Sequence, residues 1–435
     1  MRKKYYKFEI LLTSALSVGS GENVVTDKDI LRNSAGVPFV PGSAAAGVFR
    51  ESFIRRYAWE RGVDRSVAEG EAKKYFGYIE KARKANQETD ARASRVITYD
   101  IVLDPEGAEA YRVSKRDGVG LDEYKTAIQG DKYDFEILEP GVRFVTYIEQ
   151  DIISKKDLDI GAYLIRAWRS EEISFGCKTT RGLGGTKLQA ARTAEFDLEQ
   201  EVEKWLSFDL YGDSPDWKTV DLKKAGGDTD RISVEMKLQQ MGGLSIRQYT
   251  TAVGGTEADY EQLYMMRTVD GGQKKCPIIP GTSWSGAFRH HMESIKKGCA
   301  DPVFGKTDKK RRSLISFGES ELSWAKEKLI TRNAIDRFTN ATVGHALYKE
   351  RTCFYGNTSL SIRVSRKAPE EFLKVLCMSI LDLHQGILSL GGLTAVGRGI
   401  FTIKELYING RQVLLEDDMT AAYDRLCKAM GGGGS

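Results

Sequence analysis

The alternation of apolar and polar residues predicts that the chain opens with a β-strand. Residues 5–17 (YYKFEILLTSALS) alternate and are rich in β-forming side chains. Strand patterns return at residues 94–104 and 142–150, and an amphipathic helix is expected over 157–169, before the Gly-rich stretch 173–188. Between the first two strands lie a polar loop and a stretch with helical spacing. This order of strands and helices is typical of a small antiparallel sheet that carries helices.

The second half of the chain repeats this order. A strand pattern over residues 231–251 leads to an acidic loop and a second stretch with helical spacing, and a later strand is expected at 313–322. A closing helix is expected over 369–383, followed by a second Gly-rich stretch at 388–403. We therefore predict an α+β fold made of two tandem ferredoxin-like or RRM-like modules, each with a projecting hairpin.

Domain boundaries follow from the same pattern. The first module is predicted to span residues 1–195 and the second residues 231–430. Residues 196–230 are acidic and then rich in Gly and Asp, which favours a linker that contains some helix. The terminal GGGGS, residues 431–435, is interpreted as an appended linker and is left out of the fold prediction.

The helical stretches of the two halves contain two copies of one motif. Residues 37–53 read VPFVPGSAAAGVFRESF, and residues 276–292 read CPIIPGTSWSGAFRHHM. The identities in register are Pro38, Pro41, Gly42, Gly47, Phe49 and Arg50, which recur as Pro277, Pro280, Gly281, Gly286, Phe288 and Arg289. A self-match at a fixed offset without gaps indicates a duplicated unit.

Each copy is expected to start a helix at a Pro-Gly turn. Ser43 and Thr282 are suitable N-cap residues. Gly42 and Gly281 let another backbone approach closely, and the unpaired N–H groups of the first helical turn would seat a phosphate. The alternative is a structural helix that makes a close helix–sheet contact at Gly47.

Composition limits the classes of function. The 435 residues include 65 Lys and Arg against 61 Asp and Glu, a formal net charge of +4, so a polyanion site must be a local stripe. Six cysteines lie far apart without a Cys-x-x-Cys pair, which indicates free thiols in a reducing compartment, and four histidines argue against a multi-histidine metal site. With no bilayer-length apolar run and no signal-peptide pattern, the cytoplasm is the expected location.

Each half also contains a polar, Gly-punctuated segment that is expected to project as a long hairpin or loop. These segments cover residues 111–135 and 330–356. The residues that correspond, with a two-residue gap, are Arg116, Asp117, Leu121, Asp122 and Ala127 in the first and Arg332, Asn333, Ile335, Asp336 and Ala341 in the second. Tyr124 and Phe338 within them are suited to stacking on bases, although both also fit a hairpin core.

In combination, these motifs resemble the backbone subunits of type III CRISPR effector complexes, which belong to the RAMP superfamily. Gly-x-Gly, a loop aspartate and then Ile-Leu-Arg-x-x-x-Gly-x-Pro-x-x-Pro-Gly-Ser resemble the opening of that family. The projecting segments resemble its thumb loops, and the Gly-rich ends at residues 176–185 and 391–399 resemble its C-terminal glycine motif. The chain is similar to a tandem fusion of two such subunits, as in type III-D-like systems.

The resemblance implies that each half binds a segment of guide RNA and that its thumb wedges into the guide–target duplex. Family members cleave the target RNA with a loop aspartate and a divalent metal, so an endoribonuclease that uses Mg²⁺ or Mn²⁺ is expected. Its expected partners are guide RNA, complementary target RNA and other type III subunits, including the large polymerase-like subunit. The residues expected to contact RNA are Gly42, Ser43, Arg50, Gly281, Thr282, Arg289, Arg116, Arg332 and Arg337.

By position, Asp27 is the expected catalytic aspartate of the first half, because it lies five residues before Arg32. Asp29 is close by and can be confused with it. RNA carries its own nucleophile in the 2′-OH, so a nuclease needs in-line geometry first and a carboxylate that accepts a proton or holds a metal second. Without the resemblance, Asp27 would be interpreted as an ordinary solvated turn residue.

The second half departs from this pattern. The residue five positions before Arg267 is Gln262, which is not an acid. Glu257, Asp259 and Glu261 lie nearby, so the second site has either kept a shifted carboxylate or lost its activity. Asp259 is the candidate that we favour.

Three alternative functions are open. The chain could be a non-catalytic scaffold that binds guide RNA, or a stand-alone endoribonuclease that processes precursor guide RNA with His290 or His291. Neither histidine has a counterpart in the first half, which favours a packing or surface role for both. A tandem RRM-like binder outside CRISPR is disfavoured by the lack of an RNP1-type aromatic run.

Overall fold

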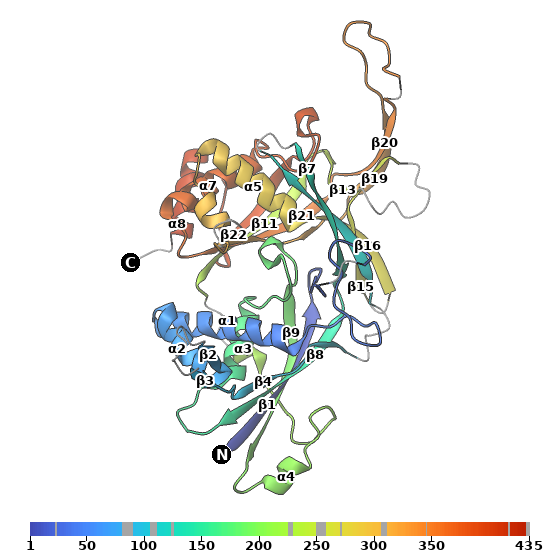
Figure 1. Cartoon of the computed structure of the whole chain (residues 1–435). Coiled ribbons are helices and arrows are strands. Elements are labelled where there is room, and N and C mark those ends of the chain that lie inside the picture. The colour runs from blue at the N-terminus through green and yellow to red at the C-terminus, as the bar shows by residue number, and fades with distance from the viewer. Residues whose placement is uncertain are drawn as a thin grey trace, which may run out of the picture.

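The computed structural model describes residues 1–21, 24–80, 90–104, 111–122, 126–224, 229–248, 258–269, 272–305, 311–344, 346–415 and 418–431. These residues form two α+β modules, with the N-terminal module below the C-terminal module in Figure 1. Glu257 and Tyr124, which the sequence singles out, lie outside the described residues. All six cysteines carry free thiols. None of the described helices is long and apolar enough to cross a membrane.

The first module is built on an antiparallel sheet whose main strands run in the order β9-β1-β8-β4. The first strand of the module thus lies between the third and the fourth, which is the order of a ferredoxin-like fold. The elements are β1 (Arg2–Leu12), α1 (Gly42–Arg61), α2 (Arg65–Phe76), β4 (Val96–Thr98), β8 (Arg143–Ile152), α3 (Ile160–Arg169) and β9 (Thr186–Asp197).

The core of this module lies between the sheet and helices α1 and α3. Phe8 alternates onto the helical face of β1, and its ring centroid lies 4.9 Å from that of Trp168 on α3. Phe49 on α1 approaches the same Trp168 edge-on at 5.5 Å. The Trp168 indole N–H donates to Thr186 Oγ1 at 3.0 Å, so its polar atom is satisfied within the core.

The second module repeats the same architecture. Its main strands run in the order β22-β11-β21-β17, again antiparallel throughout. Trp284 and Phe288 on the first helix of the module pack on Phe401 and Phe317, with centroids 5.5 and 5.3 Å apart. The elements are β11 (Arg231–Gln240), α5 (Gly281–Ile295), β17 (Ile315–Phe317), β21 (Asn357–Ser365), α7 (Glu370–His384), β22 (Phe401–Ile408) and α8 (Met419–Met430).

Even a local irregularity recurs in both sheets. The pairing of β1 with β9 shifts register between Glu9 and Ile10, and the pairing of β11 with β22 shifts between Lys237 and Leu238. In both cases the extra residue lies on the last strand of the module, as in a β-bulge. The predicted α+β fold with two tandem modules is therefore confirmed.

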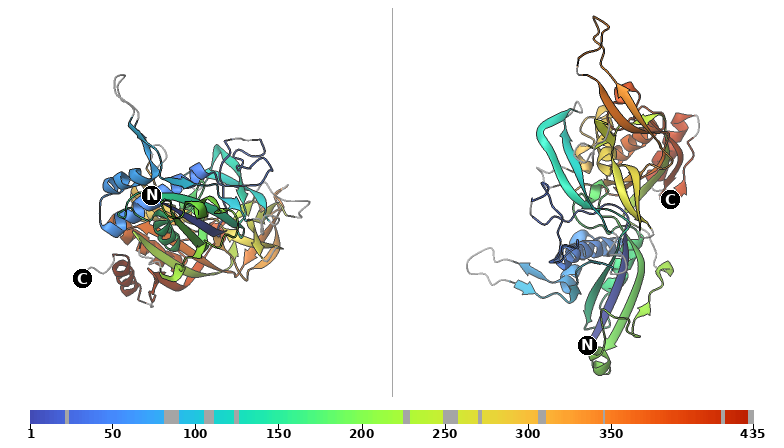
Figure 2. Two further views of the ribbon diagram at one scale, coloured as in Figure 1. Left: turned by 90° about the horizontal axis from the view of Figure 1, so that it is seen from below. Right: turned by 90° about the vertical axis from the view of Figure 1, so that its right-hand side faces the viewer.

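Each module projects a long hairpin, as predicted. The first hairpin consists of β6 (Val113–Leu121) and β7 (Ala127–Leu138), and the second of β19 (Lys326–Arg332) and β20 (Tyr348–Phe354). In Figure 2, the first hairpin, in teal, reaches alongside the second module, while the second hairpin, in orange, extends away from the molecule. We call these two hairpins the first and second thumb.

In the segment 196–230, predicted as a linker with some helix, residues 205–217 pack on the face of the first sheet that the helices leave open. The Trp205 indole N–H donates to Tyr5 Oη at 2.8 Å, and the rings of Tyr5 and Phe208 lie 5.1 Å apart. The segment contains α4 (Val202–Leu206), β10 (Lys218–Thr219) and the 3₁₀ helix η3 (Leu222–Lys224). Its strand β10 pairs with β9 at the edge of the sheet.

Shorter elements complete the fold, most of them in the second module. Strand β14 pairs in parallel with β20, and β15 and β16 form a further hairpin. They are β2 (Tyr78–Glu80), β3 (Asp90–Arg92), β5 (Val102–Leu103), η2 (Thr179–Arg181), β12 (Gly243–Leu244), β13 (Arg247–Gln248), β14 (Tyr260–Gln262), β15 (Tyr264–Val269), β16 (Gly272–Ile279), α6 (Asp301–Phe304), β18 (Ser320–Glu321), η4 (Thr394–Val396) and β23 (Arg411–Gln412).

The helices of the duplicated motif begin two residues earlier than predicted. Their N-caps are Pro41 and Pro280, both with extended backbone, so the prediction that Ser43 and Thr282 are N-caps is wrong. Proline fixes φ near the value that an N-cap requires, and the helix then starts at the following glycine. Ser43 and Thr282 lie exposed in the first turn.

The close helix–sheet contact occurs at Gly42 and not at Gly47. A Cβ on Gly42 would lie 2.6 Å from the carbonyl oxygen of Thr98, whereas the space around Gly47 is open. The first turn of α1 therefore packs directly on the backbone that follows β4.

The two modules contact each other through the Gly-rich end of the first. A Cβ on Gly281 would overlap the carbonyl oxygens of Arg181 in η2 and of Phe317 in β17. A Cβ on Gly182 would lie 2.6 Å from the Glu319 nitrogen. Backbone of the first module is therefore in direct contact with the N-terminus of α5 in the second.

Candidate active site

Asp27 lies at the base of the first thumb, on the loop that follows β1. Its N–H donates to Asp134 Oδ1 at 2.8 Å, and its own Oδ2 accepts from the Asp134 N–H at 2.9 Å. The Glu136 N–H donates to the Lys28 carbonyl at 3.0 Å, so the loop runs along the outer edge of β7. These bonds fix the position of Asp27, whose residue surface stays exposed to solvent.

Asp29, the neighbour that could be confused with Asp27, has a structural role in the same loop. Its carboxylate accepts from the N–H groups of Val24, Val25 and Thr26 at 2.7–3.0 Å and from the Thr26 hydroxyl at 2.8 Å. The N–H of Val25, with the other donors, lowers the pKa of Asp29 to about 2. Asp29 is buried and holds the loop closed, so Asp27 is the carboxylate that is presented to solvent.

Asp259 makes a similar contact in the second module, although its N–H bonds to a backbone carbonyl and not to a carboxylate. Its N–H donates to the Lys349 carbonyl at 2.9 Å, and its Oδ2 accepts from the Lys349 N–H at 2.7 Å. Lys349 lies on β20, which corresponds to β7 of the first thumb, and Asp259 is exposed like Asp27. Asp259 is therefore the structural counterpart of Asp27. Glu261, the other described candidate, is paired with Arg351 at 3.4 Å.

Lys178, Tyr133 and Lys28 gather on the first thumb, and sequence reasoning missed the contacts between them. Lys178 Nζ donates to Tyr133 Oη at 3.1 Å and lies over the Phe135 ring at 3.3 Å. Lys28, the residue after Asp27, lies over the same Tyr133 ring at 5.8 Å. Burial lowers the pKa of Lys178 to about 8. Lys178 lies 44 positions beyond Asp134 in the chain (178 − 134), so neither spacing nor motif connects it to this loop.

The surroundings of Asp259 differ from those of Asp27. Here Glu350 on β20 forms a buried ion pair with Arg398, with N–O distances of 3.1 and 3.0 Å. The neighbouring rings of Tyr260 and Tyr348 meet edge-on at 6.3 Å. Leu393 occupies the place in the Gly-rich end that Lys178 holds in the first module, with nearly the same left-handed backbone (φ 59° against 56°). The buried cationic side chain near the second thumb is therefore Arg398, which comes from a different position than Lys178 of the first module.

The positions beside Gly42 and Gly281 that were predicted to bind phosphate are filled by other groups of the same chain. The Gly42 N–H donates to Asp100 Oδ1 at 2.6 Å, so this amide at the start of α1 already has an anionic acceptor. Gly281 is covered by the carbonyl oxygens of Arg181 and Phe317. Both glycines are buried and serve close packing in this structure.

Arg116, expected at an RNA contact, lies buried between the modules. Its guanidinium forms an ion pair with Glu319 of the second module and lies 4.0 Å from Glu139. Burial raises the pKa of Glu139, and the negative charge of Glu319 acts in the same direction. Arg116 is thus part of the contact between modules, because the first thumb reaches back over the second module.

The other predicted arginines are closer to the surface. Arg289 is paired with Asp301 at 2.8 Å. Arg50 is half-buried on α1, and Arg332 is half-buried at the end of β19. Arg337 is exposed in the second thumb, beside Phe338, whose residue surface is 97% exposed.

Asp336 shapes the tip of the second thumb. Its Oδ1 accepts from the Phe338 N–H at 2.9 Å, the Thr339 N–H at 2.8 Å and the Thr339 hydroxyl at 3.0 Å. The pKa of Asp336 is lowered by these donors, the Thr339 N–H first among them. The turn presents Phe338 and Arg337 to solvent at the far end of the hairpin.

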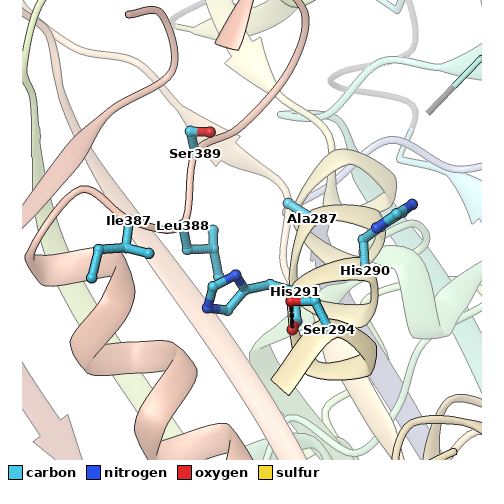
Figure 3. A pocket seen from close by; sticks show the side chains of 7 residues that line it. All are labelled: Ala287, His290, His291, Ser294, Ile387, Leu388 and Ser389. Carbon is cyan, nitrogen blue, oxygen red and sulfur yellow. Dashed lines mark hydrogen bonds between the residues drawn. The ribbon is translucent and has the colours of Figure 1, made fainter. Parts of the chain in front are cut away.

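His290 and His291 lie on α5 beside a pocket of about 210 Å³. His291 Nε2 lies 2.6 Å from Asp382 Oδ2 on α7. Figure 3 shows the His291 ring directed toward Leu388, whereas His290 points away from it. His291 therefore joins α5 to α7, as a packing role would require.

Neither site resembles a preformed metal cage. Within the described residues, no group of three or more His, Cys, Asp or Glu side chains is arranged to hold a metal ion. At the first site, however, Asp27 and Asp134 each use one carboxylate oxygen in their reciprocal bonds. A carboxylate pair of this kind fits the preference of Mg²⁺ for one or two carboxylates together with phosphate oxygens.

Comparison with known proteins identifies the family. The family description "RAMP superfamily" matches residues 9–187 and 266–402, which is more than half of the chain. The chain belongs to the RAMP superfamily. The two matched regions fall in the two modules, so the predicted membership of the RAMP superfamily is confirmed.

Among solved structures, this RAMP protein is similar to a chain in the "Cryo-EM structure of the Type III-B Cmr-beta bound to cognate target RNA". The two are 16% identical with a TM-score of 0.32, and the match covers 41% of this chain. It spans 60% of the length of that chain. A search of the curated proteins finds no match.

Proposed function

We propose that this RAMP protein is a subunit of a type III CRISPR effector complex that binds guide RNA and cleaves the paired target RNA at two sites. Asp27 would serve the first site and Asp259 the second. Sequence choice would come from base pairing, with the protein contacting backbone and shape. Its partners would be guide RNA, target RNA and further type III subunits.

The observation that carries the proposal is the equivalent placement of the two aspartates. Asp27 and Asp259 are both exposed, and both are bonded through Oδ2 to the second strand of their own thumb. A duplicated acid at the base of a projecting arm suits a protein that acts at two separate points along one bound strand. The RAMP membership of both modules supports the same conclusion.

Cleavage requires little from the protein beyond the correct placement of the target RNA and of one carboxylate. The 2′-OH of the target attacks the adjacent phosphorus once the ribose leaves A-form geometry, and a thumb inserted into the duplex would displace a base and release that ribose. A carboxylate next to the scissile bond can then accept the 2′-OH proton or hold a cation. Asp27 and Asp259 are in place for either role, because each keeps its N–H and one oxygen bonded to a thumb.

A divalent cation, Mg²⁺ or Mn²⁺, is part of the proposal for the first site. Asp27 and Asp134 would hold it together with phosphate oxygens of the RNA. When bound, the cation would stabilise negative charge on the phosphate. At the second site the thumb residue bonded to Asp259 is Lys349, which brings no second carboxylate.

The test is target cleavage by the assembled complex with Asp27→Asn or Asp259→Asn. Asparagine keeps a carbonyl oxygen that accepts the thumb N–H, so the loop should stay in place while the acid is lost. Each variant should lose one product band and keep the other, with guide RNA still bound. Asp213→Asn is the control, since its side chain is 91% exposed in the segment 196–230. Unchanged bands in both variants would refute catalysis by these two aspartates, whereas a wild-type complex that makes no cut would leave the scaffold function.

The stand-alone processing function has a separate test. His291, paired with Asp382, is the described histidine best placed for acid–base chemistry there. Incubating the chain alone with precursor guide RNA decides the question. Cutting that disappears in His291→Ala would favour this alternative over the guided complex.

A further inference from the structure

A pocket of about 290 Å³ lies at the seam between the two modules, and neither candidate acid lines it. Its floor is the face of the second sheet that carries no helices, and its wall is the C-terminal end of α3 in the first module. In Figure 1, β11 and β22 lie on the side of the second module that faces the first. The residues that line the pocket include four arginines, Arg169, Arg231, Arg363 and Arg366.

The strand register places two of these arginines on one face of the sheet. On β11, the buried residues Ile232 and Val234 point into the core of the second module. Arg231 and Ser233 alternate with them and therefore lie on the open face. Ser233 pairs directly with Arg363 on β21, which puts Arg363 on the same face. The alternation that builds the core thus directs both arginine side chains toward the first module.

Arg363 is held by a carboxylate of the first module. Its guanidinium forms an ion pair with Glu171 and also donates to the Glu171 carbonyl at 2.7 Å. Burial lowers the pKa of Arg363. The Glu171 carboxylate is therefore already engaged, and its ion pair holds the wall of the pocket against the floor.

Arg231 has no such partner. Within the described residues, its guanidinium makes neither an ion pair nor a hydrogen bond. Burial lowers the pKa of Arg231, the charge of Arg55 acts in the same direction, and Asp230 and Glu172 offset this only in part. Glu172 itself lies 3.6 Å from Arg56. A partly buried cation without a counter-ion is costly, so this position is suited to an anion from outside the chain.

The other two arginines bring positive charge that their own contacts do not cancel. Arg169 donates to the Leu222 carbonyl, and Arg366 donates to the Thr229 carbonyl at 3.5 Å. Arg366 also lies 5.8 Å from the ring centroid of Trp59. Carbonyl oxygens and a ring face carry no net charge, so both arginines contribute to a positive potential in the pocket.

We infer that this pocket binds a phosphate group, with Arg231 as its main ligand. Arginine suits this role because its planar fork of N–H donors matches two phosphate oxygens in parallel hydrogen bonds. The volume lies close to the lower limit of ligand pockets, about 300 Å³, so it admits a phosphate with a small group attached. The phosphate group belongs to a small molecule or to an RNA backbone. In either case it would contact both modules and strengthen the seam.

Glu235 provides a test in the opposite direction. It lines the same pocket, its residue surface is exposed, and its Oε1 accepts from the Ser233 hydroxyl at 3.4 Å. A carboxylate at this place repels an incoming anion. Removing its charge should therefore tighten phosphate binding, whereas removing the charge of Arg231 should weaken it.

The experiment is isothermal titration calorimetry of the full chain with inorganic phosphate and with AMP, at constant ionic strength. The variants are Arg231→Met, Arg231→Lys and Glu235→Gln. The fold should tolerate methionine, because the Arg231 guanidinium bonds to no other group of the described chain. Arg411→Met, at an exposed arginine on β23 that does not line the pocket, is the matched control.

We expect the wild type to bind phosphate and Arg231→Met to bind it about tenfold or more weakly, since a hydrogen bond to a charged group contributes about that much. Arg231→Lys should lie between the two, because an ammonium group keeps the charge but loses the fork. Glu235→Gln should bind phosphate more tightly, and Arg411→Met should bind it like the wild type.

A titration with single-stranded RNA that has no terminal phosphate separates the two sources of the ligand. If Arg231→Met also loses affinity for this RNA, the phosphate group comes from the RNA backbone. If it loses affinity for AMP and phosphate alone, the ligand is a small phosphorylated molecule. Both results would support the pocket as a phosphate site.

Two results would overturn the inference. One is a wild type that gives no binding heat with phosphate or AMP at millimolar concentrations, and the other is Arg231→Met that binds both like the wild type. Should Arg231→Met fail to fold, unchanged affinities in Arg231→Lys and Glu235→Gln would overturn it equally. The inference is independent of RNA cleavage, so Asp27→Asn and Asp259→Asn should bind phosphate like the wild type.

Discussion

Asp27 and Asp259 accept the same hydrogen bond, from the N–H of the second strand of the thumb in their own module. The donors are Asp134 at 2.9 Å and Lys349 at 2.7 Å. The two sites therefore share this bond but differ in the residue that donates it, because Asp134 brings a second carboxylate to Asp27 whereas Lys349 brings none to Asp259. Duplication kept the placement of the acid and changed its neighbour.

This difference predicts unequal dependence on divalent cations. In Asp134→Asn the side-chain oxygen can still accept the Asp27 N–H, but one negative charge is lost. We expect the Mg²⁺ concentration for half-maximal first-site cleavage to rise by about tenfold or more, because even the loss of an outer partner of a metal costs about 10–100-fold. Cleavage at the second position in the same complex is the internal control. An unchanged Mg²⁺ dependence would argue against a cation held by Asp27 and Asp134.

The contact between the modules predicts that alanine at two glycines of α5 has opposite effects on stability. Gly281 touches backbone carbonyls of Arg181 and Phe317, whereas the space around Gly286 is open. We expect Gly281→Ala to lower the free energy of unfolding by about 1–3 kcal/mol through overpacking. Gly286→Ala should stabilise by up to about 1 kcal/mol, because alanine has the higher helix propensity. Chemical denaturation of the two variants measures both, and equal effects would contradict the packing role.

Much of the architecture was predictable because it repeats. The duplicated Pro-Gly motif, the strand order and both thumbs follow from local patterns that appear twice in the chain. The N-cap prediction was wrong because Pro41 and Pro280 take the N-cap position that Ser43 and Thr282 were expected to fill. Whether Asp27 and Asp259 catalyse cleavage stays a prediction.

The rest of the site depends on contacts between distant segments. Asp134 and Lys178 carry no motif of their own: Asp134 meets the Asp27 loop and Lys178 meets Tyr133 only because distant segments come together on β7. Arg116 looks like an exposed thumb residue in the sequence, but its ion pair with Glu319 joins two modules that local patterns treat separately. The spacing rule failed for Asp259 because the loop between it and the second motif contains the additional strands β14 and β15.

The buried pair of Arg116 and Glu319 predicts strong coupling across the modules. Either single change, Arg116→Met or Glu319→Met, leaves a charged group buried without its partner and should cost about 3–5 kcal/mol of unfolding free energy. The double variant Arg116→Met with Glu319→Met should lose much less than the sum of the two, because neither member of the pair is then left without the other. A double-mutant cycle by chemical denaturation measures this coupling, and simple additivity would show that the pair does not act as one unit.

Asp29 predicts a stability contribution that depends on pH. Its pKa is lowered to about 2 in the folded loop, chiefly by the Val25 N–H, against about 3.9 in an unfolded chain. The contribution is therefore present above about pH 4 and is lost as the pH falls toward about 2. Thermal melts of the wild type and Asp29→Asn should differ at pH 7 and converge between pH 4 and pH 2. A constant difference over that range would mean that the charged form of Asp29 is not what closes the loop.

The tip of the second thumb predicts a loss of activity without a loss of stability. Phe338 is 97% exposed and is presented by the turn that Asp336 closes, so Phe338→Ala removes almost no packing. If the ring stacks on a displaced base, its removal should slow cleavage at the second position by about tenfold or more, since such stacking contributes about 1–3 kcal/mol per base. Leu206→Ala, at an exposed apolar residue on α4, is the control. Second-position cleavage by Phe338→Ala at the wild-type rate would exclude this ring as the wedge, and a lowered melting temperature would show that it packs within the protein.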